Sequence, residues 1–174
     1  NYKESTQGIF NTEIQSGDTA TDDLVNSIMA AVNRFMMNKV EKDIQKAYQT
    51  FFEALYDFLF VCRELGNPVL KSFADEALYR GLLYRYLGYG FVEKNADKRV
   101  EPQYNNIYVS WSKQPKNHYI ESKLYGTMTL LTCKIDEPYY GIDLEAFGVV
   151  RGQEAEVVFP TIKETITEVK YINE

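Results

Sequence analysis

The chain has 174 residues, of which 45% are hydrophobic and 14% aromatic, and this is enough to build the core of one ordinary domain. Its formal net charge of -6 argues against the general phosphate-binding surface that dominates nucleic-acid affinity. We see no apolar leader segment and no apolar run of about 18 residues. We therefore expect neither an intact signal peptide nor a membrane span, and a soluble protein that acts in a cytoplasm, its own or that of a target cell.

The first half of the chain has the periodicity of helices. Thr21-Asp22-Asp23 offers an N-cap and early negative charge to an amphipathic segment that runs to about Asn38. A second apolar stripe starts near Val40 and stops at Gly66-Asn67-Pro68, a combination typical of a helix end. Residues 21–70 are therefore predicted to form a helical layer.

Beyond residue 70 the sequence changes to short apolar runs separated by polar residues, glycine and proline. Five of these runs predict strands: Leu78–Leu83, Ile107–Ser112, Thr127–Ile135, Glu154–Phe159 and Ile166–Tyr171. Helices first and strands after indicate an α+β fold rather than a doubly wound one. We expect a single domain over residues 1–174, with a polar arm at 1–20 and a β-rich catalytic core at 71–174.

Several kinds of chemistry lack their residues. His118, the only histidine, cannot by itself form a multi-histidine metal site, and its polar context favours a surface position. Cys62 and Cys133 have no metal-ligand or redox spacing and are predicted to be small buried hydrophobes. The sequence also lacks the signatures of Ser hydrolases, P-loop proteins and Rossmann folds. We therefore expect no metal cofactor.

Two short elements place polar groups on predicted strands. Arg80 lies within an otherwise apolar run, and the following Gly81 lets another group approach the backbone. Such a charge needs an anionic partner, although a snorkelling arginine at a strand end is the alternative. Further along, Ser110 and Ser112 share one face of a strand by its period of two. Their hydroxyls suit hydrogen bonds to a polar ligand or a carboxylate, and the pattern is also common on exposed strands.

The third element is a pair of glutamates near the C-terminus. If the predicted strand starts at Glu154, then Glu154 and Glu156 point to the same side. Like charges on one face resist simultaneous ionisation, as in paired acid/base sites. A solvated edge strand is the alternative interpretation. A glycosidase is another, although the sequence lacks the several tryptophans expected of a sugar-stacking cleft.

In this order and spacing, the three elements resemble the Arg, Ser-x-Ser, Glu-x-Glu pattern of mono-ADP-ribosyltransferases of the toxin and ecto-enzyme type. Tyr79-Arg80-Gly81 is similar to the first signature strand of that family, Tyr108–Lys113 to its Ser-Thr-Ser strand, and Gln153–Pro160 to its catalytic strand. Trp111 stands where the family usually has threonine, and strand alternation points it away from the hydroxyl face. The resemblance implies N-terminal helices packed on a split, mainly antiparallel β-sheet core of the ADP-ribosyltransferase type.

The resemblance also implies that NAD is the substrate and that its bond between nicotinamide and ribose is cleaved. Glu156 would stabilise the oxocarbenium-like transition state. Arg80, with Gly81 beside it, would bind the phosphates of NAD through its fork of donors. Ser110 would orient Glu156, with Ser112 in support.

The resemblance also assigns residues to nicotinamide and to the acceptor. Tyr119 or Tyr125 would stack on nicotinamide. Glu154 would bind the acceptor and draw off its proton. Because Glu-x-Glu members usually modify arginine, we expect an arginine on a protein as the acceptor.

Alternative functions stay open. RNA is the other macromolecular acceptor that we consider. An NAD glycohydrolase and an inactive relative that binds a partner through its helical face are the remaining alternatives. A bacterial or phage toxin or effector fits the resemblance, as does a defence factor, and the oligomeric state is not predicted.

Overall fold

The computed structural model describes residues 19–37, 44–87, 100–115, 127–149 and 155–173. By their internal contacts, the residues divide into two compact units. The first, which we call the helical unit, comprises Asn1–Tyr79 and Ile142–Val149; the second, the sheet unit, comprises Arg80–Gly141 and Val150–Glu174. Whether the chain forms a single domain stays a prediction.

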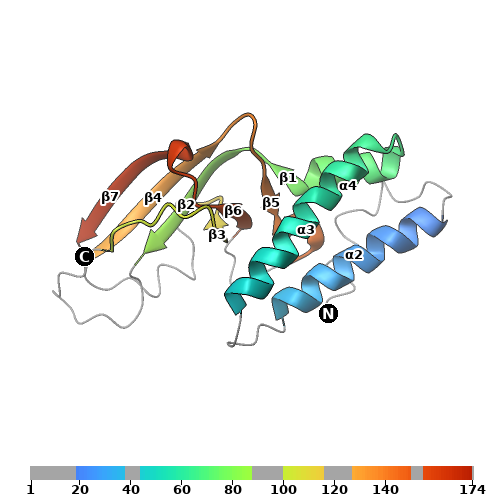
Figure 1. The fold of residues 1–174 in the computed structure, drawn as a ribbon, viewed down its shortest axis with the longest axis horizontal. Helices are drawn as coiled ribbons and strands as arrows, with labels where there is room; N and C mark the ends of the chain where they lie inside the picture. Colours follow the sequence, from blue (N-terminus) through green and yellow to red (C-terminus); the bar gives the residue numbers. More distant parts are fainter. Residues whose placement is uncertain (1–18, 38–43, 88–99, 116–126, 150–154, 174) are drawn as a thin grey trace. The chain divides into compact units, whose positions relative to one another are not determined.

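The helical unit contains three α-helices and a short 3-10 helix. Their bounds are α2 (Thr19–Met37), α3 (Ile44–Glu64), α4 (Pro68–Ala77) and η1 (Leu144–Phe147). Helices α2 and α3 lie side by side (Figure 1), and the rings of Phe35 and Phe51 stack at 4.1 Å between centroids. The ring of Phe73 in α4 meets Phe147 of η1 edge to face at 5.4 Å. The two helices predicted in residues 21–70 are present as α2 and α3.

Helix α4 was not predicted, because the signal that ends α3 also starts the next helix. Gly66 has a φ of 71°, the left-handed conformation typical of a residue just after a helix. The side chain of Asn67 then accepts hydrogen bonds from the backbone N–H groups of Val69 and Leu70, and Pro68 occupies the first turn. Helix α4 continues to Ala77, and strand structure begins at Leu78, where the first strand was predicted.

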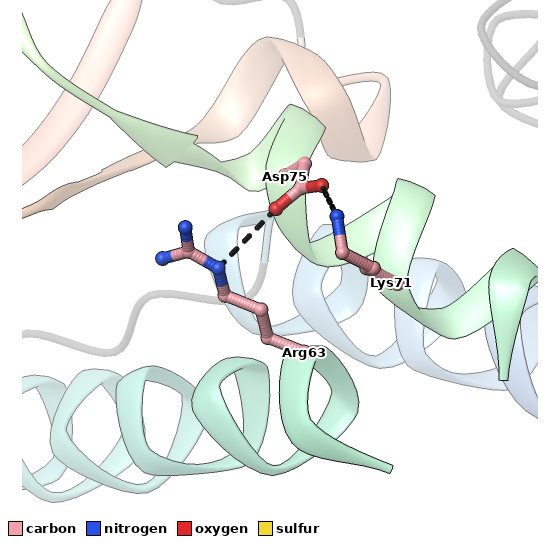
Figure 2. Close-up of polar contacts among 3 residues, drawn as sticks. All are labelled: Arg63, Lys71 and Asp75. Carbon is pink, nitrogen blue, oxygen red and sulfur yellow. Dashed lines mark hydrogen bonds and ion pairs between the residues drawn. The ribbon is translucent and has the colours of Figure 1, made fainter. Parts of the chain in front are cut away.

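A cluster of charges joins α4 to the end of α3. Asp75 lies between two cations (Figure 2), with Arg63 Nε at 3.4 Å from one carboxylate oxygen and Lys71 Nζ at 2.8 Å from the other. All three side chains are at least a third exposed. Exposed ion pairs contribute at most about 1 kcal/mol each, so the apolar core does most to stabilise this helix pair.

The sheet unit carries β2 (Gly81–Leu87), β3 (Tyr108–Ser112), β4 (Thr127–Ile135), β6 (Glu156–Pro160) and β7 (Ile166–Asn173). With the short β1 (Leu78–Tyr79) and β5 (Gly141–Asp143), they form a curled seven-stranded sheet in the order β1-β5-β6-β3-β2-β4-β7. The pairs β2–β3, β2–β4, β3–β6 and β4–β7 are all antiparallel. The prediction of an α+β fold with a mainly antiparallel sheet is confirmed, and its ADP-ribosyltransferase type stays a prediction.

Most predicted strands are present with small shifts of their ends. The run Thr127–Ile135 is β4 as predicted, whereas Leu78–Leu83 is interrupted at Arg80 and continues as β2. The interruption coincides with Gly81, whose φ of 138° favours glycine. Strand β5 was not predicted, because three residues are too few to show an alternation.

Several apolar side chains of the sheet unit are buried. Trp111 is 2% exposed, and its indole N–H donates to the carbonyl of Phe159 at 3.0 Å. Burial raises the pKa of the Cys133 thiol to about 11, against a weaker lowering by its hydrogen bond to Thr165. In the helical unit burial also raises the pKa of Cys62. Both cysteines are free and buried, as predicted.

Within the described ranges, no helix combines the length and the apolar character needed to cross a membrane.

Candidate functional site

Strands β3 and β6 bring the predicted serines and Glu156 together. In their antiparallel register Ser112 lies directly opposite Glu156, and Ser110 lies opposite Val158. Residues directly opposite have Cβ atoms about 5 Å apart, and residues displaced by two along one strand have them about 7 Å apart. Ser110, Ser112 and Glu156 therefore share one face of the sheet, with Ser112 the nearer neighbour of the glutamate.

Burial distinguishes this pair from an exposed strand edge. Glu156 is 3% exposed and Ser112 is 4% exposed. Each carboxylate oxygen of Glu156 has less than 1 Å² of accessible surface. Removing a carboxylate from water is costly, so a glutamate at such a position is unusual on an ordinary sheet. The solvated edge strand considered for the glutamates does not describe Glu156.

The hydroxyl oxygen of Ser112 has a backbone partner. Its oxygen accepts a hydrogen bond from the backbone N–H of Gln114 at 3.1 Å. A serine hydroxyl has one proton to donate besides its acceptor positions. Because the Gln114 contact uses an acceptor position, the proton of Ser112 can be donated to a carboxylate.

The backbone just before Glu156 has a rare conformation. Ala155 has a φ of 48°, and its carbonyl accepts from Lys113 N at 3.0 Å. Left-handed φ is uncommon for residues other than glycine, and such strain often occurs at functional sites. Strand β6 begins at Glu156, so the predicted strand start at Glu154 is wrong. Strand alternation therefore cannot be used to place Glu154 and Glu156 on a common side. Glu154 itself lies outside the described residues.

Arg80 is held by the segment Glu137–Tyr140, which we call the arginine loop. Its Nε donates to the carbonyl oxygen of Tyr139 at 3.0 Å, and its guanidinium carbon lies 3.9 Å from the ring centroid of Tyr140. Nη1 is 3.8 Å from the carboxylate of Glu137, whose side chain is 88% exposed. These contacts use the edge at Nε and one flat face of the guanidinium, and the contact of the Nη edge with the described residues is a long ion pair.

The arginine loop packs on the strand that carries Glu156. The rings of Tyr139 and Phe159 meet edge to face with centroids 6.3 Å apart. Gly141 approaches the same strand so closely that an added Cβ would be 2.6 Å from Val157 Cγ1. The arginine loop therefore contacts both Arg80 and β6, and all three belong to the sheet unit.

Three residues near these positions carried no recognised signal in the sequence. Arg85 donates from Nη1 to the backbone carbonyl of Ser110 at 2.7 Å, and Tyr139 and Tyr140 hold Arg80. The sequence did offer one indication of Arg85, because it is a second arginine in a strand-like segment, Tyr84-Arg85-Tyr86. The predicted nicotinamide-stacking residue Tyr119, its alternative Tyr125 and His118 lie outside the described residues.

The described residues include a hollow away from the predicted site residues. Across the described ranges, no group of three or more His, Cys, Asp or Glu side chains is placed to hold a metal ion. A hollow of about 380 Å³ lies in the helical unit against Pro68, Lys71, Ser72, Asp75 and Glu76. None of the predicted site residues lines it.

Comparison of the chain with protein-family models, with curated proteins and with solved structures gives no match.

Proposed function

We propose that this protein is an NAD-dependent mono-ADP-ribosyltransferase that transfers ADP-ribose to a macromolecule. The observation that carries the proposal is the pairing of Ser112 with the buried Glu156 across β3 and β6. This pairing unites two of the three sequence elements that resemble the family. The third, Arg80, lies in the same unit, beside a loop that packs on β6.

The proposed reaction needs a fixed negative charge near the ribose of NAD. The bond between the ribose carbon and the nicotinamide nitrogen breaks, and its electron pair leaves with the nicotinamide. Positive charge then develops on the ribose, and a carboxylate in a water-poor site stabilises it more strongly than one in water. Glu156 supplies this charge, and Ser112, directly opposite it on β3, is its proposed hydrogen-bond donor.

Arg80 is the proposed ligand of the NAD phosphates. The hydrogen bond from Nε and the ring of Tyr140 restrict the rotation of its guanidinium. The Nη edge then has the geometry for a bidentate contact with an oxyanion. A phosphate of NAD bound at this edge replaces the exposed carboxylate of Glu137 as the partner of Nη1.

The proposed reaction also needs an acceptor for the ADP-ribose. By the resemblance, Glu154 accepts a proton from an arginine of a target protein as the new bond forms. A guanidinium stays protonated in water, so it needs a nearby carboxylate to become a nucleophile. The acceptor then takes the place of nicotinamide on the ribose carbon.

The test is incubation of the protein with NAD labelled in its adenylate part, together with cell extract that contains protein and RNA. We expect label on macromolecules, and we expect Glu156→Gln to lower the rate at least about 100-fold, as expected for loss of a fixed charge that acts on the transition state. Glu168→Gln is the matched control, because Glu168 is exposed on β7 of the same unit.

The products separate the alternatives. Label on RNA would change the acceptor, and label only in free ADP-ribose would make the protein an NAD glycohydrolase. Full activity of Glu156→Gln, or intact NAD with the wild-type protein, would contradict the proposal.

A further inference from the structure

Strand β3 has very different support on its two sides. Towards β6 all five of its residues are in register, from Tyr108 opposite Pro160 to Ser112 opposite Glu156. Towards β2 the register contains a single pair, Tyr84 with Ser112. Had the β2–β3 ladder continued, Tyr86 would have come to lie opposite Ser110.

Two side chains of β2 bind the β3 segment near the end of that ladder. Arg85 donates from Nη1 to the carbonyl of Ser110 at 2.7 Å, and the hydroxyl of Tyr86 donates to the carbonyl of Pro115 at 2.7 Å. The first is a charge-assisted hydrogen bond of the shorter and stronger kind. The stretch that carries both serines is therefore held from β2 at each end by a side chain.

We propose that Arg85 is a positioning residue that holds the backbone at Ser110 and thereby aligns the hydroxyl of Ser112 with Glu156. The inference rests on the proposed function, because it assigns Arg85 to the same reaction. Arg85 acts through the backbone of β3, so it is distinct from Arg80, whose contacts are with the arginine loop. A positioning role predicts a slower chemical step and little change in NAD binding.

The experiment compares Arg85→Met and Arg85→Lys with the wild-type chain in NAD cleavage. We expect Arg85→Met to lower kcat about tenfold and to leave the KM for NAD within about twofold. Arg85→Lys keeps a cationic donor and should recover at least part of kcat. Arg63→Met is the matched control, since it removes an arginine that pairs with Asp75 in the helical unit, and it should leave kcat unchanged.

Two results would overturn the proposal. One is an unchanged kcat in Arg85→Met. The other is a raised KM with an unchanged kcat, which would make Arg85 a ligand of NAD. Unfolding in urea, followed by fluorescence, identifies a variant that does not fold. If Arg85→Met does not fold, the kcat and KM of Arg85→Lys alone decide.

Amide hydrogen exchange separates this inference from the proposed function. Without NAD, exchange in residues 110–114 should be faster in Arg85→Met than in the wild type, and Arg63→Met should match the wild type. This result supports the positioning of β3 even if the wild-type protein leaves NAD intact, which would refute only the proposed function. Equal exchange in Arg85→Met and wild type would refute the positioning itself.

Discussion

The Ser112–Glu156 pair and Arg80 occupy the same unit but are positioned by different kinds of interaction. The first pair is placed by the register of two antiparallel strands and is almost fully buried. Among the described residues, Arg80 is placed by a hydrogen bond, a ring contact and a long ion pair, and its side chain is 32% exposed.

This difference bears on how each position responds to mutation. A position set by a ladder is supported by backbone hydrogen bonds, so replacing the side chain of Ser112 or Glu156 itself alters chemistry more than placement. A position set by a few side-chain contacts can be moved by changing one of them. The ladder-held residues should therefore affect the chemical step, and the loop around Arg80 should affect binding.

Among the further variants that test this comparison, Ser112→Ala is expected to have the largest effect. Removal of the hydroxyl takes away the proposed donor to Glu156, and we expect kcat for NAD cleavage to fall about 10- to 100-fold, as for other groups that orient a catalytic ligand. Ser110→Ala is the matched variant, because Ser110 shares the face but lies opposite Val158. Its kcat should fall less than about threefold. A larger loss in Ser110→Ala than in Ser112→Ala would return the orienting role to Ser110.

The two serines also show what could be read from the sequence. Alternation along a strand correctly put both hydroxyls on one face, because that depends only on local backbone geometry. Which serine lies opposite Glu156 depends on the register of strands more than 40 positions apart in the sequence, and no local pattern encodes it. The order of the motifs thus predicted that Ser110, Ser112 and Glu156 lie together, and the strand register shows which serine is opposite the glutamate.

Other features were missed for equally specific reasons. Helix α4 shares its start signal with the end of α3, and β5 is too short to show a period. The positive φ of Ala155 has no sequence marker, because alanine rarely adopts it and glycine or asparagine would have been the clue. Arg85 was not predicted, because it binds a backbone carbonyl. Every residue has such a carbonyl, so the sequence does not reveal the partner.

A smaller effect, on binding, is expected from Tyr140→Leu. The ring of Tyr140 lies 3.9 Å from the guanidinium carbon of Arg80, and cation–π contacts contribute about 0.5–2 kcal/mol. Its loss should free the guanidinium to rotate and raise the KM for NAD about three- to tenfold with little change in kcat. Tyr140→Phe keeps the ring and should keep the KM. Initial rates over a range of NAD concentrations give both constants, and a fall in kcat alone would contradict the assignment of this loop to binding.

The smallest effect, of opposite sign, is expected from Glu137→Gln. The Glu137 carboxylate is 3.8 Å from Arg80 Nη1 and attracts the guanidinium that we propose as the ligand of the NAD phosphates. Because exposed ion pairs are weak, removing this competitor should lower the KM for NAD only about twofold, and less at high salt. Asp136→Asn is the matched control, since it removes the same charge one position earlier, where the carboxylate pairs with Lys134. An equal decrease in both variants would mean that the overall negative charge opposes NAD binding. A rise in KM in Glu137→Gln alone would show that Glu137 holds Arg80 in its binding position, which would reverse the role assigned to this carboxylate.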